Sequence, residues 1–301
     1  MLLLHEILKP ERKTAVVDVG AASTPVVGGS RPYATLLALG LCRVIGFEPQ
    51  RETWPRGGPF ETYLPHIIGD GSEGELRVCH APWMTSLFEP AEFAMNVFRF
   101  REACAIVRRE LVKTTRLDDI EDIVRIDFLK IDAQGSELAA IQGAARKLKD
   151  TVFAQLEVQF LPLYEKQPMF WEIHAAMERR GFILHTFAES QLMMIPPYRY
   201  EPRPDAAMRQ IFAADAVYVR DFSRLDRLEP EAVKQMALIA HYCYGSFDLT
   251  YRCIDYLSNC GALPLGEAQR YMGTLEDADD ERNRARESDD IGAGSAPVLR
   301  H

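Results

Sequence analysis

The amino-acid sequence predicts an α/β protein built on a doubly wound, mostly parallel sheet. Up to about residue 220, short β-branched runs alternate with segments of helical periodicity, and the connections between them are short. Beyond residue 224 the pattern changes to helices alone. The 301 residues, 47% of them hydrophobic and 26% charged, suffice for one large domain or two small ones.

Glycine or an acidic residue ends the first expected strands. Residues 14–20 end at Gly20, and residues 43–48 end at Glu48. Further strands are expected at residues 62–68, 77–79, 127–132, 152–160, 182–187 and 214–219. Helices are expected at residues 33–41, 89–111, 136–148, 170–179, 231–241 and 248–258.

These elements divide the chain into three segments. Residues 1–225 form the sheet domain, and residues 226–263 form a helical extension that packs on the sheet or on a second copy of the chain. Residues 264–301 form a tail. Eight carboxylates and three arginines fall within residues 276–290, so the tail is expected to be flexible from about residue 275.

Charge and hydropathy exclude two classes of partner. The net charge is −9, and no basic run is present that would neutralise nucleic-acid phosphates. The apolar runs are much shorter than the roughly 20 residues of a membrane span. The start of the chain has no basic segment followed by a long apolar one, so we expect a cytoplasmic protein. The six cysteines are scattered, without a zinc-binding spacing.

Ligands of parallel sheets bind beyond the carboxyl ends of the strands. There, Gly20 lets the backbone approach a cofactor, and Glu48 can accept hydrogen bonds from a ribose diol. The loop after Gly20 lacks the G-x-G-x-x-G pattern, because Ala22 and Thr24 stand where further glycines are expected. The sequence therefore favours a nucleoside cofactor without phosphates over NAD.

The most specific motif is D-F-L-K-I-D-A-Q-G-S-E at residues 127–137. A Leu-Asp pair at residues 117–118 precedes it, and a strand with Glu157, a Pro-Leu-Tyr at residues 162–164 and a late D-A-V-Y-V-R at residues 215–220 follow. On these residues the chain resembles the FkbM-type methyltransferases, over roughly residues 14–221.

That resemblance implies a class I, Rossmann-like fold of seven strands, the last one antiparallel, with S-adenosylmethionine as cofactor and methyl transfer generally to oxygen. It matches Asp18 and Gly20 to the first cofactor motif, Glu48 to the ribose-binding acid and Asp70 to the adenine region. The loop of residues 22–32 departs from the family by its length and its lack of Asn-x-Gly. The expected cofactor-binding residues are Asp18, Gly20, Ala21, Glu48, Pro49, Asp70 and Ser86.

Methyl transfer to a neutral alcohol needs an acceptor oxygen held in line with the methyl group and a group that takes its proton. Asp132 and Glu157, at the ends of adjacent strands, are the expected catalytic residues, with His185 behind them. Either carboxylate could instead hold a divalent metal, which the sequence does not predict. The structural alternatives are that Asp132 caps the helix near Ser136 or bonds Lys130 across the turn, and that Glu157 pairs with Lys130 or Arg146.

The leading hypothesis is an S-adenosylmethionine-dependent O-methyltransferase acting on a hydroxyl of a sugar, glycan or small secondary metabolite. Tyr164 and Trp171 are candidates for the acceptor pocket or for the core. Two alternatives remain: a nucleotide-sugar or NAD-linked Rossmann enzyme, and a catalytically inactive scaffold. A homo-oligomer would form through the C-terminal helices.

Overall fold

A computed structural model describes residues 3–22, 31–197 and 209–276 of the chain. Its main sheet has seven strands in the order β3-β2-β1-β6-β7-β9-β8, and only β9 runs antiparallel to the others. The predicted fold class, including the antiparallel last strand, is confirmed. The strands are β1 (Thr14–Val19), β2 (Cys42–Phe47), β3 (Glu61–Leu64), β6 (Phe128–Ile131), β7 (Phe153–Gln159), β8 (Phe182–Met193) and β9 (Gln210–Arg220).

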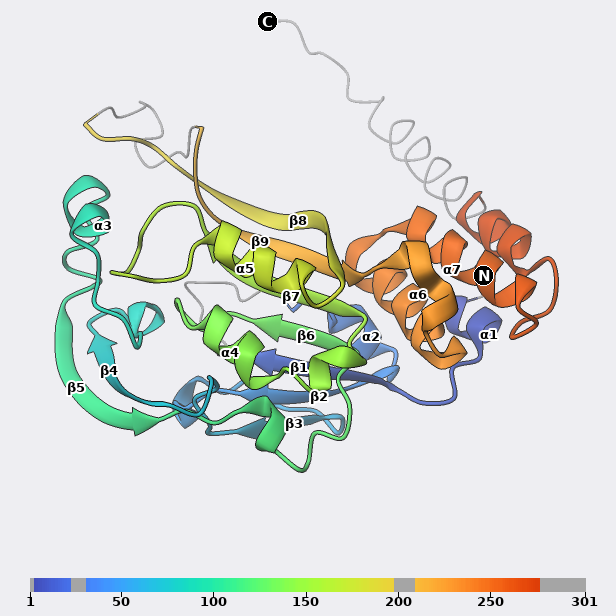
Figure 1. Cartoon of the computed structure of the whole chain (residues 1–301), viewed down its shortest axis with the longest axis horizontal. Helices are drawn as coiled ribbons and strands as arrows, with labels where there is room; N and C mark the ends of the chain where they lie inside the picture. Colours follow the sequence, from blue (N-terminus) through green and yellow to red (C-terminus); the bar gives the residue numbers. More distant parts are fainter. Residues whose placement is uncertain (1–2, 23–30, 198–208, 277–301) are drawn as a thin grey trace, which may run out of the picture.

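Helices cover both faces of this sheet because the central strands are apolar on both sides (Figure 1). Val16 and Phe128 point into one core, whereas their neighbours Val17 and Leu129 point into the other. The first core is closed by α1 (Leu4–Leu8), α2 (Ala34–Ala38), α6 (Pro230–Tyr244) and α7 (Phe247–Asn259). The second is closed by α4 (Glu137–Gly143) and α5 (Phe170–Glu178).

The C-terminal helical pair packs on the sheet domain. Pro230 opens α6, and Gly245, with φ +60°, makes the turn into α7. Residues 232–240 of α6 are all buried. Two hydrogen bonds fix the helix to the sheet: Thr14 donates to the side chain of Gln235 over 2.6 Å, and Tyr244 donates to Gln155 over 2.9 Å.

The chain remains ordered beyond the helical pair. Residues 267–276 are helical, and Tyr271, 1% exposed, lies 2.9 Å by its hydroxyl oxygen from Nδ1 of His241. Residues 264–276 are therefore anchored to the helices. The predicted flexibility from about residue 275 concerns residues that lie almost wholly outside the described ranges.

The prediction of a helix over residues 89–111 is wrong. Only α3 (Glu92–Val97) is helical there, and β5 (Ile106–Lys113) pairs antiparallel with β4 (Glu73–Cys79). Arg109 donates hydrogen bonds of 2.6 Å to both Glu75 and Glu89. In the sequence this arginine fits the solvent-exposed face of a helix, but in the structure it pairs with an acid of the neighbouring strand.

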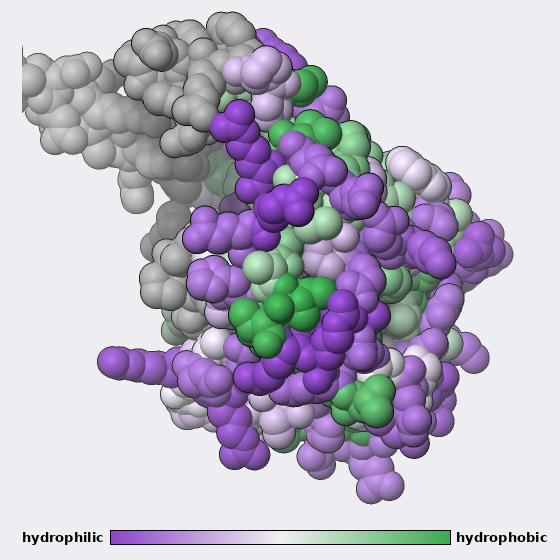
Figure 2. All heavy atoms as spheres, turned by 90° about the vertical axis from the view of Figure 1, so that its left-hand side faces the viewer, coloured by the Kyte–Doolittle hydropathy of each residue, from purple (hydrophilic) through white to green (hydrophobic). Residues whose placement is uncertain are grey.

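These elements form the end of the molecule opposite the helical pair, and Figure 2 looks onto it. Hydrophobic side chains lie there among mostly hydrophilic ones. The exposed large hydrophobic residues of α3 and β5 are Phe93, Val107 and Leu111.

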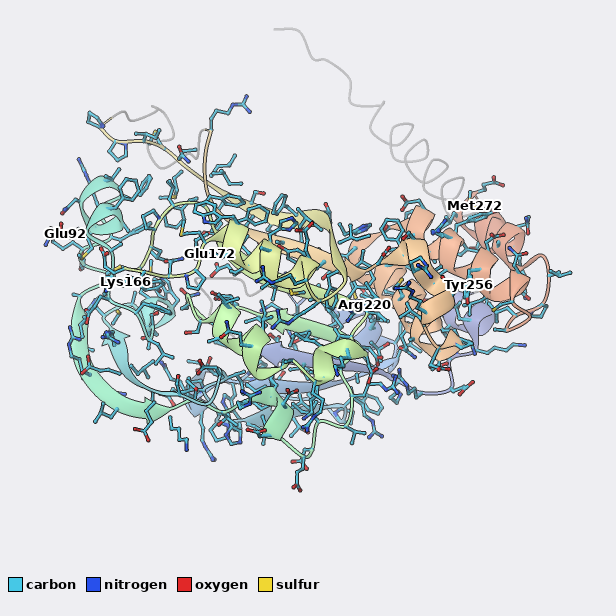
Figure 3. The ribbon with its side chains drawn as sticks, viewed as in Figure 1. Glu92, Lys166, Glu172, Arg220, Tyr256 and Met272 are labelled. Atoms are coloured by element: carbon cyan, nitrogen blue, oxygen red, sulfur yellow. The ribbon has the colours of Figure 1, made fainter. Side chains whose placement is uncertain are left out.

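Arg220, labelled in Figure 3, ends β9 near the helical pair. Its guanidinium donates to the carbonyls of Thr151, Arg180 and Leu148, and lies 3.9 Å from the ring centroid of Phe182. Burial lowers the pKa of Arg220 to about 10. In the part of the chain that the structure describes, no helix has the length and apolar character to cross a membrane.

Candidate active site

A cavity of about 400 Å³ opens at the carboxyl ends of the parallel strands. It lies where the strand order reverses, between β1 and β6, which is where ligands of open α/β sheets bind. It is lined by the loops after β1, β2 and β6, by residues 82–87, and by Gln191 and Met193 of β8 and Phe212 of β9.

Six of the nine predicted site residues line this cavity, and three do not. The lining residues are Gly20, Glu48, Pro49, Ser86, Asp132 and Glu157. Asp18 lies behind the cavity, where it accepts hydrogen bonds from Tyr33 and Lys130. Ala21 donates its backbone N–H to Phe47, and Asp70 accepts a hydrogen bond from the N–H of Ser72.

Gly20 is required by the packing of two strands. Its φ is +77°, and a Cβ there would lie 1.9 Å from the carbonyl oxygen of Asp132. The backbone of Asp132 is itself tied to β1, because its N–H donates to Val19 over 2.9 Å. The loop predicted to touch the cofactor and the predicted catalytic residue are therefore in direct contact.

Glu48 places a carboxylate at the end of β2 that is almost buried, with 9% of its surface exposed. Its Oε1 accepts a hydrogen bond of 2.8 Å from the N–H of Gln50. Burial raises the pKa of Glu48, and the negative charges of Asp132 and Glu52 add to the effect. Its other oxygen can accept hydrogen bonds from a ligand, which a pair of hydroxyl donors would supply.

Asp132 and Glu157 meet in the same part of the cavity. The amide nitrogen of Gln134 donates to Asp132 Oδ1 over 2.7 Å and to Glu157 Oε2 over 3.3 Å. Glu157 keeps some contact with solvent through the cavity, but protein surrounds its other sides. This burial, followed by the charge of Asp132, raises the pKa of Glu157 well above its usual value. Two carboxyl groups so arranged can hold and move a proton.

Neither Asp132 nor Glu157 makes the contacts that the purely structural alternatives require. The carboxylate of Glu137 accepts from the N–H groups of Ala133 and Gly135, so Glu137 rather than Asp132 organises the start of α4. Lys130 pairs with Asp18, and Arg146 donates its N–H to Asp118. Neither basic residue is the partner of Glu157.

Sequence reasoning missed Gln134 and Glu137. Glu137 is 2% exposed, and burial raises its pKa to about 7. An acid two residues after a glycine at the start of a helix is the signal that could have found it. The left-handed backbone of Gln134, with φ +48°, follows from tertiary contacts and has no comparable signal.

The three remaining candidates are not among the residues that line the cavity. Tyr164 is fully buried and donates to the side-chain oxygen of Gln134 over 3.0 Å. Trp171 is 58% exposed on α5 and does not line the cavity. His185 Nε2 lies 3.0 Å from the hydroxyl of Ser246, toward the helical pair, and burial lowers its pKa.

The cavity is anionic. Lys130 is the only lysine or arginine among its described lining residues, and it lies 3.3 Å from Asp18. Three acids face the cavity: Glu48, Asp132 and Glu157. Such a lining suits a ligand that carries positive charge and no phosphate. Within the described residues, no three His, Cys, Asp or Glu side chains form a group that could hold a metal ion.

Residues 18–184 match the family model described as the methyltransferase FkbM domain. Among solved structures, a TehB-like SAM-dependent methyltransferase from Corynebacterium glutamicum is 11% identical, with 72% of this chain and 87% of that chain covered and a TM-score of 0.32. Magnesium protoporphyrin IX methyltransferase from Synechocystis, solved with bound SAM, is 12% identical, with 70% and 71% covered and a TM-score of 0.30. No curated protein matches the chain.

Proposed function

The chain belongs to the FkbM family of S-adenosylmethionine-dependent methyltransferases, and from this premise we propose that it methylates a hydroxyl oxygen of a sugar, glycan or small secondary metabolite. The observation that carries the proposal is the anionic cavity, lined by Glu48 after β2, by Asp132 after β6 and by Glu157 of β7. Its two halves correspond to a cofactor subsite and an acceptor subsite.

In the cofactor half, the oxygen of Glu48 that does not bond Gln50 accepts the hydrogen bonds of the ribose hydroxyls. Phe47, His66 and Ile68 line the same part of the cavity and offer apolar and aromatic surface to the adenine. The acids that line the cavity favour the positive charges of the sulfonium and ammonium groups over a pyrophosphate.

In the acceptor half, Asp132 takes the proton of the acceptor hydroxyl. When bound, S-adenosylmethionine supplies an activated methyl group, so that the oxygen–methyl bond forms while the sulfur–methyl bond breaks and the O–H proton passes to Asp132. Phe212 and Leu163 close this half of the cavity with apolar surface, which limits water around the reacting oxygen. Positioning and proton removal then supply the acceleration.

The same observations weigh against the two alternatives. A nucleotide-sugar or NAD-linked enzyme needs donors or cations for two phosphates, and Lys130 is committed to Asp18. Among the described residues, no lysine or arginine donates a hydrogen bond to Asp132 or Glu157. A scaffold without activity has no need of two such acidic side chains that meet in a cavity, because the pair costs stability.

Two measurements test the proposal. Calorimetry with S-adenosylhomocysteine and with NAD is expected to show binding of the first and none of the second. Methyl transfer from labelled S-adenosylmethionine to a panel of sugars and phenols is expected to label at least one hydroxyl. Binding of NAD alone would favour the Rossmann enzyme, and binding of S-adenosylhomocysteine without any transfer would favour the scaffold.

A further inference from the structure

Gln134 adopts a backbone conformation that its residue type disfavours. Its φ is +48°, and the next residue, Gly135, has φ +96°. A side chain other than glycine in this left-handed region costs about 1 to 2 kcal/mol. Such a conformation persists only where the surroundings impose it, and functional sites are where it concentrates.

Four contacts hold Gln134 in place. Its backbone carbonyl accepts a hydrogen bond of 2.6 Å from the hydroxyl of Ser86, and its side-chain oxygen accepts one of 3.0 Å from Tyr164. The amide nitrogen then faces the two acids, at 2.7 Å from Asp132 and 3.3 Å from Glu157. The hydroxyl of the fully buried Tyr164 also lies 3.2 Å from the carbonyl oxygen of Met84. The amide nitrogen is the end that faces the acids because ionised carboxylates only accept hydrogen bonds.

We propose that Gln134 is the positioning residue of the acceptor half of the cavity: its amide donates hydrogen bonds to Asp132 and Glu157 at once and so holds Asp132 in place to accept the proton of the acceptor hydroxyl. This inference rests on the proposed function. Burial and nearby carboxylates raise the pKa of Glu157, and the hydrogen bond from Gln134 opposes that rise because it favours the ionised form of Glu157.

No lysine or arginine of the described residues donates a hydrogen bond to either acid, so the amide supplies what a cation supplies elsewhere. Lys130 attracts Asp132 from β6, but its ammonium bonds Asp18. The other titratable groups that face Asp132, Glu157 or Tyr164 are carboxylic acids or thiols. When they are ionised, their negative charges make it less favourable for both carboxyl groups of the pair to be ionised at once. These other groups are Glu48, Cys79, Cys104, Glu137 and Asp215.

The test uses a variant that suits the backbone. Gln134→Gly removes the amide and accepts φ +48°, so the fold and the affinity for S-adenosylhomocysteine are expected to persist. We expect kcat to fall by about 10- to 100-fold, with the KM for S-adenosylmethionine unchanged. The acid limb of the pH profile should move to higher pH by about one unit, because both carboxyl groups lose the hydrogen bond from Gln134, while Gln191 stays 3.5 Å from the other oxygen of Glu157.

Two further variants sharpen the test. Gln134→Glu keeps the length of the side chain but adds a third acid, so it should shift the acid limb further in the same direction. Lys166→Gly is the matched control, because Lys166 has φ +60°, is exposed and lies in a neighbouring loop (Figure 3). Its kcat and pH profile are expected to equal those of the wild type.

A second measurement does not depend on turnover. Carbon NMR of the protein labelled at its side-chain carboxyl carbons follows the titration of the pair in the complex with S-adenosylhomocysteine. A shift of this titration to higher pH in Gln134→Gly supports the positioning role, whether or not the wild type methylates an acceptor. If the titration shifts but the wild type methylates no acceptor, the proposed function fails and the inference stands. An active wild type whose pH profile and carboxyl titration are unchanged in Gln134→Gly would overturn the inference.

Discussion

The ammonium of Lys130 lies 3.3 Å from the carboxylate of Asp18, and both side chains are buried between neighbouring strands. The hydroxyl of Tyr33 donates to the other oxygen of the same carboxylate over 2.5 Å. Asp18 therefore has two buried partners behind the cavity, and its structural contribution can be separated from cofactor binding by experiment.

Lys130→Met should destabilise the fold, because it leaves the carboxylate of Asp18 buried without its cation. Removal of one partner of a buried pair costs about 3 to 5 kcal/mol. Urea unfolding measures this loss, while the affinity for S-adenosylhomocysteine of the folded fraction should stay near that of the wild type. Lys149→Met, at an exposed lysine, is the control. A normal stability combined with a large loss of affinity would show that the pair acts on the ligand.

Glu48→Ala should weaken binding of S-adenosylhomocysteine by about 10- to 100-fold, the equivalent of losing hydrogen bonds to a charged acceptor. Isothermal titration calorimetry measures the effect. Glu52→Ala removes an exposed acid from the next turn and should leave the affinity unchanged. Equal affinities of Glu48→Ala and the wild type would remove Glu48 from the cofactor subsite.

Asp132→Asn retains the size of the side chain but cannot take a proton. With an acceptor that the wild type methylates, turnover should fall by about 100- to 10,000-fold, while the melting temperature and the affinity for S-adenosylhomocysteine change little. Turnover that persists in this variant would transfer the role of base to Glu157.

Glu137→Gln should change how stability depends on pH. The pKa of Glu137 is raised to about 7 by burial, from 4.5, so the folded state binds the proton more tightly than the unfolded state does. The stability of the wild type due to this group is therefore complete below about pH 4.5 and is lost as the pH rises through 7. The glutamine variant lacks this loss, which is on the order of 3 kcal/mol.

Urea unfolding at several pH values between 5 and 8 follows the difference between the two proteins. We expect the difference to move in favour of Glu137→Gln as the pH rises. Glu121→Gln, at an exposed position, should run parallel to the wild type. If Glu137→Gln also ran parallel, the carboxyl group of Glu137 would be ionised in the folded protein throughout this range.

Local patterns were enough to predict most of the fold. Alternate residues of β1 and β6 face two different cores, and β-branched or aromatic runs of this kind are recognisable without tertiary information. Pro230 and Gly245 likewise indicate the limits of α6 from local sequence alone. The segment around Arg109 was not predictable, because its pairing with Glu75 depends on a strand more than thirty residues earlier.

Only those site residues that lie near the carboxyl ends of strands could be predicted from the sequence. Gly20, Glu48 and Asp132 directly follow β1, β2 and β6, Glu157 lies near the end of β7, and the topology brings all four to one cavity. The sequence does not reveal that Asp18 faces away from this cavity. The surroundings of Gln134 likewise depend on contacts between distant segments, which no local pattern records.

Strand β8 has one neighbour in the main sheet, β9, and β9 lies between β7 and β8. When the chain is synthesised from its N-terminus, residues 182–193 are complete before residues 210–220 exist. Until then β8 has no hydrogen-bonding partner and β7 presents an open edge, the state in which β-proteins aggregate or recruit chaperones. Because Gln191 and Phe212 lie on these last strands, the nascent protein completes its sheet and its cavity wall in the same step.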